Sequence, residues 1–186
     1  MEFFVEVDDA LMERCRRKGG ILRDYLGYLH RRGLTTPLEE SLIGTPGAEF
    51  INLIETTSMN RLYKMPLLSS FIRGDHMVLH AGWDDIARSF RGFYSNGSNR
   101  VDIRGLKHFE GYDEVPDPKW VSLARENPIR FLVRGSPRFF REDDDGFHLS
   151  DGLAHYVEQR FFTEHVRDAI GYRVADFKRA RYMNRE

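Results

Sequence analysis

The sequence predicts an α+β fold that is mainly helical, with a helix–hairpin unit and a long final helix near its C-terminus. Three observations predict it. Apolar residues recur at helical spacing through most of the 186 residues, between Thr-Pro and glycine signals that mark helix ends. Strand-like alternation is limited to short stretches such as residues 3–7. One Asp-Gly pair, Asp145-Gly146, stands between two aromatic-rich segments and indicates a β-hairpin.

Residues 1–58 are predicted to form a small, mostly helical N-terminal unit. The strand at residues 3–7 is followed by a helix that runs to Lys18, and Gly19-Gly20 ends it. Residues 21–29 repeat apolar side chains at helical spacing. Two further helix starts combine a hydroxyl cap with a first-turn proline and an acid, at the third helical position in the first and at the fourth in the second. They are Thr36-Pro37-Leu38-Glu39 and Thr45-Pro46-Gly47-Ala48-Glu49.

Residues 59–186 are predicted to form the larger unit. It begins with a buried helix from about Pro66, followed by a short strand at residues 77–79. Residues 83–94 place their large apolar side chains on one side of an amphipathic helix. Weak periodicity at residues 100–118 predicts a long loop with local order.

The C-terminal third continues this unit with two helices, a hairpin and a last helix. A helix is expected at residues 119–126, and Pro128 opens another that buries Ile129, Leu132 and Val133. The hairpin lies near residues 138–149. The final helix runs from Ser150-Asp151 to about Arg181, and Gly171 is expected to kink or divide it.

Composition limits the class of protein. Hydrophobic residues make up 41% and charged residues 31%, which is ordinary for a globular chain. The net charge of −1 argues against a wholly basic nucleic-acid coat protein. Cys15 is the single cysteine, which excludes an internal disulfide framework and a multi-cysteine zinc site. No apolar run reaches the roughly 18 residues that cross a bilayer, so we expect a cytoplasmic protein without membrane contact.

The C-terminal third holds the candidate binding residues. Residues 127–141 contain four arginines and no acid. Helix, helix and hairpin follow one another there, an order shared with winged-helix modules, in which a helix enters the major groove and the hairpin touches phosphates. Weak, salt-dependent DNA binding would follow. The predicted nucleic-acid-binding residues, including two from the final helix, are Arg130, Arg134, Arg138, Arg141, Lys178 and Arg181. The alternative interpretation is that the hairpin only covers a hydrophobic core and that its arginines are solvated.

Catalytic signatures are absent from the sequence. It contains no Walker-type loop, GxSxG, HExxH or Gly-rich dinucleotide fingerprint. The acidic run at residues 142–145 provides oxygen ligands for a hard cation, which leaves a metal-dependent nuclease as an alternative function. It also counts against the hairpin turn as the main DNA contact. His76 and His80 would lie about 13 Å apart on a strand, too far to share a metal ion. We therefore expect no catalytic residue, metal or cofactor in this chain.

Several segments resemble the C-terminal accessory region of large bacterial and phage DEAD/DEAH-box superfamily II helicases, beyond the motor. Residues 127–132 match an Asn-Pro-Ile-His-Phe-Leu element, with Arg130 in place of the histidine. Phe139-Phe140 and Tyr172-Arg173 fall in the expected order. The other two segments are Thr57-Ser58-Met59-Asn60-Arg61-Leu62-Tyr63-Lys64-Met65-Pro66-Leu67-Leu68 and Asp84-Asp85-Ile86-Ala87-Arg88-Ser89-Phe90-Arg91-Gly92-Phe93-Tyr94.

This resemblance covers roughly residues 57–181 and implies no active-site residue for this chain. It implies a non-catalytic accessory domain of a helicase or restriction-like system in DNA repair or defence. The domain would contact DNA or dock to the helicase motor, and ATP hydrolysis would lie outside the chain. A protein-interaction module of the immunity type, with a protein partner instead of DNA, is the third possibility.

Overall fold

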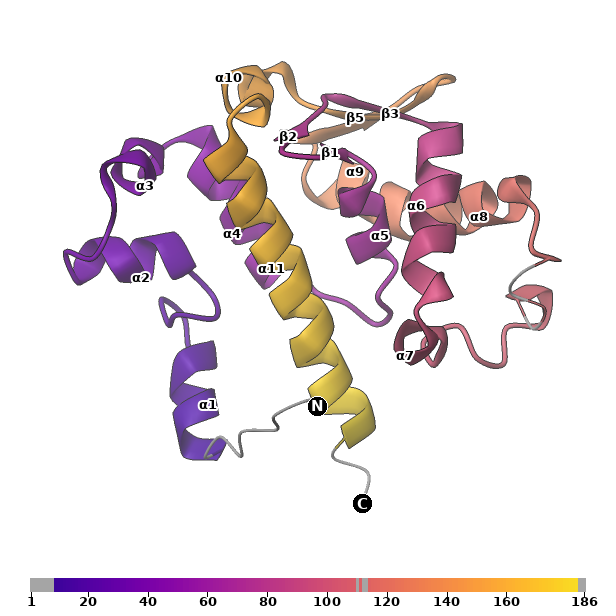
Figure 1. Ribbon diagram of the computed structural model, residues 1–186, viewed down its shortest axis with the longest axis horizontal. Helices are drawn as coiled ribbons and strands as arrows, with labels where there is room; N and C mark the ends of the chain where they lie inside the picture. The colour runs from indigo at the N-terminus through magenta and orange to yellow at the C-terminus, as the bar shows by residue number, and fades with distance from the viewer. Residues whose placement is uncertain (1–8, 110, 112–113, 184–186) are drawn as a thin grey trace. The chain divides into compact units, whose positions relative to one another are not determined.

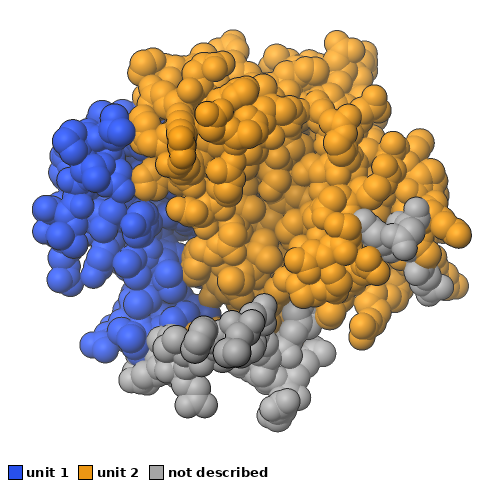
Figure 2. Space-filling model, viewed as in Figure 1, with its two compact units in different colours: residues 1–57 blue, residues 58–186 orange. Residues whose placement is uncertain are grey.

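The computed structural model describes residues 9–109, 111 and 114–183. The chain divides into two compact units, Met1–Thr57 (unit 1) and Ser58–Glu186 (unit 2), which Figure 2 colours separately. The expected strand at residues 3–7 lies outside the described residues. The architecture is α+β and mainly helical, as predicted, and its strands form two small antiparallel sheets. Within the described ranges, no helix combines the length and apolar character that crossing a bilayer demands.

Unit 1 consists of short helices whose starts are set by local side chains. Both predicted Thr-Pro starts are present: Thr36 and Glu39 form a reciprocal capping box, and the Thr45 hydroxyl accepts a hydrogen bond from the Ala48 amide. The core gathers around Phe50 and its neighbours on the fourth helix. The helices are α1 (Asp9–Arg16), α2 (Tyr25–Arg31), α3 (Pro37–Leu42) and α4 (Pro46–Thr56).

Unit 2 begins with a helix, a small hairpin and a third strand, and continues into a longer amphipathic helix (Figure 1). These elements are α5 (Lys64–Ser69), β1 (Ile72–Arg73), β2 (His76–Met77), β3 (His80–Gly82) and α6 (Trp83–Ser95). A short helix α7 (Gly97–Arg100) and a 3₁₀ turn η1 (Lys107–Phe109) follow. The predicted long loop is therefore partly ordered, and Ile103 and Val115 within it are buried.

The second half of unit 2 contains the predicted hairpin, β4 (Phe140–Glu142) and β5 (Gly146–Leu149). Strand β5 lies in the middle of a three-stranded antiparallel sheet of order β3–β5–β4. His148 of β5 therefore faces His80 of β3 on one side and Arg141 of β4 on the other. A Cβ atom on Gly146 would overlap the carbonyl oxygen of Ala81, so a glycine is needed for β5 to approach β3 this closely.

The two predicted helices at residues 119–126 and after Pro128 form one continuous path. Helix α8 (Asp117–Ala124) passes through a π-helical turn η3 (Arg125–Ile129) into α9 (Arg130–Gly135). Pro128 lies inside the π turn and opens no separate helix, contrary to the prediction. Proline has no N–H and its ring collides with the carbonyl four residues earlier, and the wider turn accommodates both.

The final helical stretch is divided, but not at Gly171. It consists of the 3₁₀ turn η4 (Asp151–Leu153), α10 (Ala154–Val157), α11 (Arg160–Lys178) and the π turn η5 (Arg179–Met183). The break falls at Gln159, whose backbone is extended. Gly171 lies inside α11, where packing against α5 supports the helix and compensates for the weak helix propensity of glycine.

The core of unit 2 is rich in aromatic rings. Trp120 is fully buried, and its ring stacks on Tyr94 with centroids 5.7 Å apart and lies 4.7 Å from Phe109. Beside it, the buried Asp102 carboxylate accepts hydrogen bonds from the Leu62 amide at 2.8 Å and the Tyr94 hydroxyl at 3.2 Å. Burial and the Asp102 charge raise the pKa of Tyr94. The aromatic cluster and this carboxylate hold α6, α8 and the intervening loop together.

Candidate nucleic-acid interface

The exposed side of α9 and the turn after it form a basic surface that carries an aromatic ring. We call Arg130, Phe131, Arg134 and Arg138 the α9 surface. All four are exposed, and the Phe131 side chain keeps 48% of its accessible surface. The opposite side of the helix is anchored by the buried Ile129 and Leu132. Arg130 and Arg134 stand four residues apart, so they share one helix face at about 6 Å between Cβ atoms.

Cation–π contacts hold two of these arginines beside aromatic rings. The Arg130 guanidinium lies 5.1 Å from the Phe131 ring centroid, and the Arg138 guanidinium lies 5.4 Å from that of Phe139. Arginine forms bidentate hydrogen bonds with phosphate, and an exposed ring can stack on an unpaired base. Positive charge and an aromatic face therefore occur together on this surface.

The π turn η3 determines which side of α9 faces outward. Arg125, the first residue of the turn, contacts the hairpin: its Nε donates to Glu142 Oε1 at 2.7 Å, and its guanidinium lies 5.0 Å from the Trp83 ring centroid. Downstream, Arg130 and Arg134 are exposed. A π turn inserts one extra residue into a helical turn, and such turns are frequent at functional sites. Here the arginine that binds Glu142 begins the turn, and the arginines of the α9 surface follow it.

The acidic turn of the hairpin is held by several contacts. Asp143 Oδ1 accepts hydrogen bonds from the amides of Asp145 at 3.0 Å and Gly146 at 3.2 Å. Its Oδ2 lies 2.8 Å from both the Arg141 guanidinium and His148 Nε2, although the approach of His148 has poor hydrogen-bond angles. The Trp83 indole donates to the Asp144 carbonyl at 2.7 Å. One of the three aspartates is thus engaged in fixing the turn and does not project freely toward a ligand.

We expect the Asp143 carboxyl to titrate unusually low. Its contact with the His148 ring, together with the Asp145 amide and Arg141, lowers the pKa of Asp143 to about 2. A depressed carboxyl pKa contributes stability that is present above about pH 4 and is lost as the pH falls toward 2. Carbon-detected NMR titration should place the Asp143 midpoint near 2, and His148→Ala should return it toward about 4. An ordinary midpoint in the parent protein would contradict the observed contact.

The structure brings together some of the predicted binding residues but not all. Arg130, Arg134 and Arg138 share the α9 surface, and Arg141 lies on β4 beside Asp143. Lys178 donates to the Ser98 hydroxyl at 2.8 Å, and Arg181 donates to the Asn60 carbonyl at 2.7 Å. Lys178 is the last residue of α11, and Arg181 lies in η5, which follows it. The first contact ties α11 to α7, and the second ties η5 to the start of unit 2.

Phe131 was not among the predicted site residues, although the sequence contains a signal for it. Residues 129 and 131 are about 200° apart around a helix, so a helix that buries Ile129 turns Phe131 outward. The rings of His80 and His148 stack with centroids 4.4 Å apart, and the sequence around either residue does not predict this contact. Their proximity depends on the pairing of β3 with β5.

A metal site at the acidic turn receives no support from the described residues. Across residues 9–109, 111 and 114–183, no three His, Cys, Asp or Glu side chains are grouped so that they could hold a metal ion. His76 lies on β2 and His80 on β3. The Asp143 carboxylate is instead engaged by two backbone amides and the Arg141 guanidinium, and it lies beside His148.

The three longest segments that resemble the helicase region lie in elements that contact one another. Residues 57–68 lead into α5, residues 84–94 lie in α6, and residues 127–132 span the end of the π turn and the start of α9. Helix α5 contacts both α6 and η3. Comparison with protein-family models, curated proteins and solved structures finds no match for this chain.

Proposed function

We propose that unit 2 is a winged-helix-like module that binds nucleic acid through the α9 surface. The order of its elements supports this: strand β3, helices α6 and α8–α9, then the β4–β5 hairpin, with β3 paired to β5. A winged helix arranges its lone strand and its hairpin in the same way, and the helix before the hairpin contacts the nucleic acid. Helix α9 occupies that position here.

The α9 surface is the observation that carries the proposal. Three exposed arginines would neutralise backbone phosphates, and Phe131 would stack on a base. Because a base offers its face to a side chain only when it is unstacked, single-stranded nucleic acid is the preferred ligand. The acidic hairpin turn would repel phosphates, so the hairpin serves to position α9 and is not itself the main contact.

We further propose that this binding is non-catalytic and serves a motor protein. The resemblance to the accessory region of superfamily II helicases supports this role. The chain would contact the nucleic-acid strand, while ATP hydrolysis would take place on the motor protein.

Binding of fluorescent oligothymidylate and duplex DNA at several salt concentrations tests the proposal. The parent chain should bind with Kd on the order of 10⁻⁴–10⁻⁶ M. Arg130→Gln and Arg134→Gln should each reduce the slope of log K against log salt by about 0.7 on single strands. Phe131→Ala should weaken single-strand binding by about 1–3 kcal/mol and leave the slope unchanged, because stacking releases no counterions.

Arg160→Gln is the matched control. Arg160 is also exposed but lies at the start of α11, where it pairs with Glu164 at 2.8 Å. This variant should bind as the parent does. If Arg130→Gln and Arg134→Gln keep the parental slope while their circular dichroism is unchanged, the α9 surface is not the binding site.

A further inference from the structure

Unit 1 contains a groove lined by basic side chains. Residues 14–32 hold seven lysines and arginines and a single acid, Asp24. Part of this charge surrounds a groove of about 820 Å³, within the usual size of a small-ligand site. The groove is lined by Arg16, Lys18, Gly19, Arg23, Asp24, Arg31, Asn52 and Thr56. Four cations thus surround one carboxylate.

The loop between α1 and α2, which forms one wall, is held in place by side chains from the other helices of the unit. Arg31 of α2 pairs with Asp24 at 2.8 Å and donates to the Gly19 carbonyl at 2.5 Å. Asn52 of α4 donates to the Arg23 carbonyl at 2.7 Å. A Cβ atom on Gly20 would overlap the Cys15 carbonyl oxygen, so the loop lies directly against the end of α1. The wall is therefore formed before any ligand arrives.

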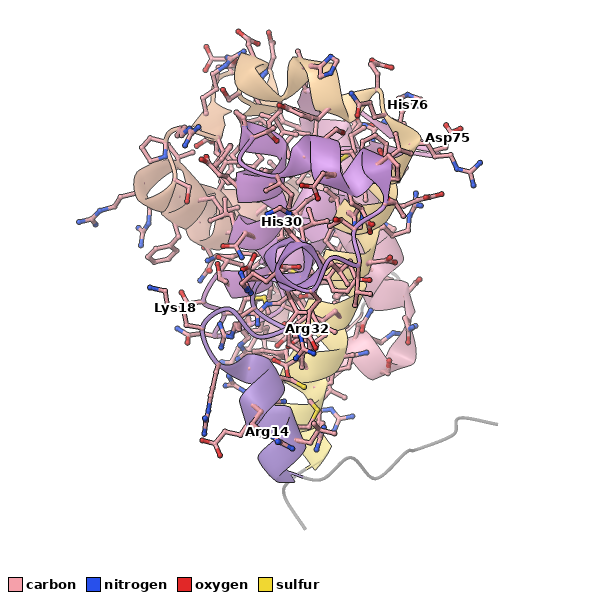
Figure 3. The ribbon with its side chains drawn as sticks, turned by 90° about the vertical axis from the view of Figure 1, so that its left-hand side faces the viewer. Arg14, Lys18, His30, Arg32, Asp75 and His76 are labelled. Carbon is pink, nitrogen blue, oxygen red and sulfur yellow. The ribbon has the colours of Figure 1, made fainter. Side chains whose placement is uncertain are left out.

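The acidic side chain that lines the groove does not form ion pairs with all of its cations. Arg31 is engaged by Asp24, the one acid present, and Asp24 also accepts the Gly27 amide at the start of α2. Lys18 and Arg23 make no ion pair inside the part of the chain that the structure describes. Lys18 extends outward from the loop, and Arg14 lies lower on α1 in Figure 3. Like charges held together in this way favour an anion between them.

We propose that this groove binds a ligand that carries several phosphate groups. Lys18 and Arg23 would contact the phosphates, while Arg31 holds the wall through Gly19 and Asp24. The volume exceeds what a single phosphate ion fills, so the ligand is a polyphosphate, a nucleoside polyphosphate or a short run of nucleic-acid backbone. All three kinds of ligand would present several phosphate groups to the cations of the groove. The proposal concerns unit 1 and is independent of the function proposed for unit 2.

Calorimetric titration of the full chain with tripolyphosphate tests the site. The variant Lys18→Gln/Arg23→Gln should lose about tenfold in affinity for each cation removed. The matched control is Arg14→Gln/Arg17→Gln, which removes two exposed charges from the same region that do not line the groove. The control should bind as the parent does. Thermal unfolding should be the same for both variants.

The outcomes of these titrations separate the possible explanations. Equal weakening of both double variants would mean that the overall positive charge of the region attracts the anion, and the groove proposal would be wrong. The proposal would also be wrong if the parent chain did not bind tripolyphosphate. Tighter binding of ATP than of pentathymidylate identifies a free nucleotide as the ligand, and the reverse identifies nucleic-acid backbone. Phe131→Ala should leave tripolyphosphate binding unchanged, so failure of the groove and failure of the α9 surface are distinguishable.

Discussion

Replacing Trp120 with alanine is expected to lower the free energy of unfolding of unit 2 by about 3–5 kcal/mol. The indole has no exposed surface and packs against Tyr94, Phe109 and Phe90, whose centroids lie 5.7, 4.7 and 6.4 Å from its own. Alanine would leave a cavity between α6, α8 and the loop that precedes α8. Because small domains are stable by only about 5–15 kcal/mol, this single change should bring unit 2 close to unfolding.

Urea denaturation monitored by circular dichroism measures this loss, and Trp83→Phe provides the comparison. Trp83 is half-buried, and phenylalanine keeps a ring beneath Arg125 while removing the indole N–H that reaches the Asp144 carbonyl. Its cost should be about 0.5–1.5 kcal/mol, the net value of one hydrogen bond. Equal costs for the two tryptophans would show that Trp120 does not lie in the core.

The Asp102→Ala variant is expected to be destabilised by about 3 kcal/mol. It removes the acceptor of two buried donors, the Leu62 amide and the Tyr94 hydroxyl, and each unsatisfied buried donor costs about 1–3 kcal/mol. Arg61 also donates to the backbone carbonyl of residue 102, and that contact survives the substitution. The loss should therefore be concentrated where residues 58–64 meet the α6–α8 loop.

Asp102→Asn separates the hydrogen bonds from the charge. Asparagine keeps an acceptor oxygen for Leu62, so this variant should lose clearly less stability than Asp102→Ala. Hydrogen exchange at the Leu62 amide should be accelerated in the alanine variant and remain protected in the asparagine variant. Identical stability losses would mean that the negative charge, rather than the acceptor, is what the core requires.

The features predicted from sequence are those that short segments determine by themselves. Thr36 and Thr45 start helices because a hydroxyl, a proline and an acid lie within four or five residues. Asp145-Gly146 predicts the hairpin because this turn signal also lies within adjacent residues. The pairing of β3 with β5 joins residues far apart in the chain, and strands of three and four residues are too short to produce a period-2 pattern that predicts it.

The positions at which the helices break were also not predicted by local sequence signals. Proline at position 128 suggested a helix start, because its ring fits a first turn, yet the preceding helix absorbs it in a π turn. Glycine at position 171 suggested an interruption, yet tertiary packing keeps α11 continuous. Local propensity is a weak preference in both cases, and the surroundings in the folded unit override it.

The candidate site was predicted in part. The run of arginines without acids pointed to residues 127–141, and the structure exposes Arg130, Arg134 and Arg138 there. The same reasoning grouped Lys178 and Arg181 with it, whereas their side chains are used in bonds to Ser98 and Asn60. A count of charges cannot distinguish a cation that faces solvent from one that is bound to a distant carbonyl or hydroxyl.

The π turn marks a place in the helical path where the chain can lose a residue without changing which side chains face the core. An α turn closes its hydrogen bond over four residues and a π turn over five, so deleting one residue within positions 125–129 would leave an ordinary α turn. Leu132 would stay buried and Arg134 exposed. The same deletion inside α9 would instead rotate everything downstream of it by about 100°. Changes of length by one residue should therefore be tolerated in η3 and not in the helices on either side of it.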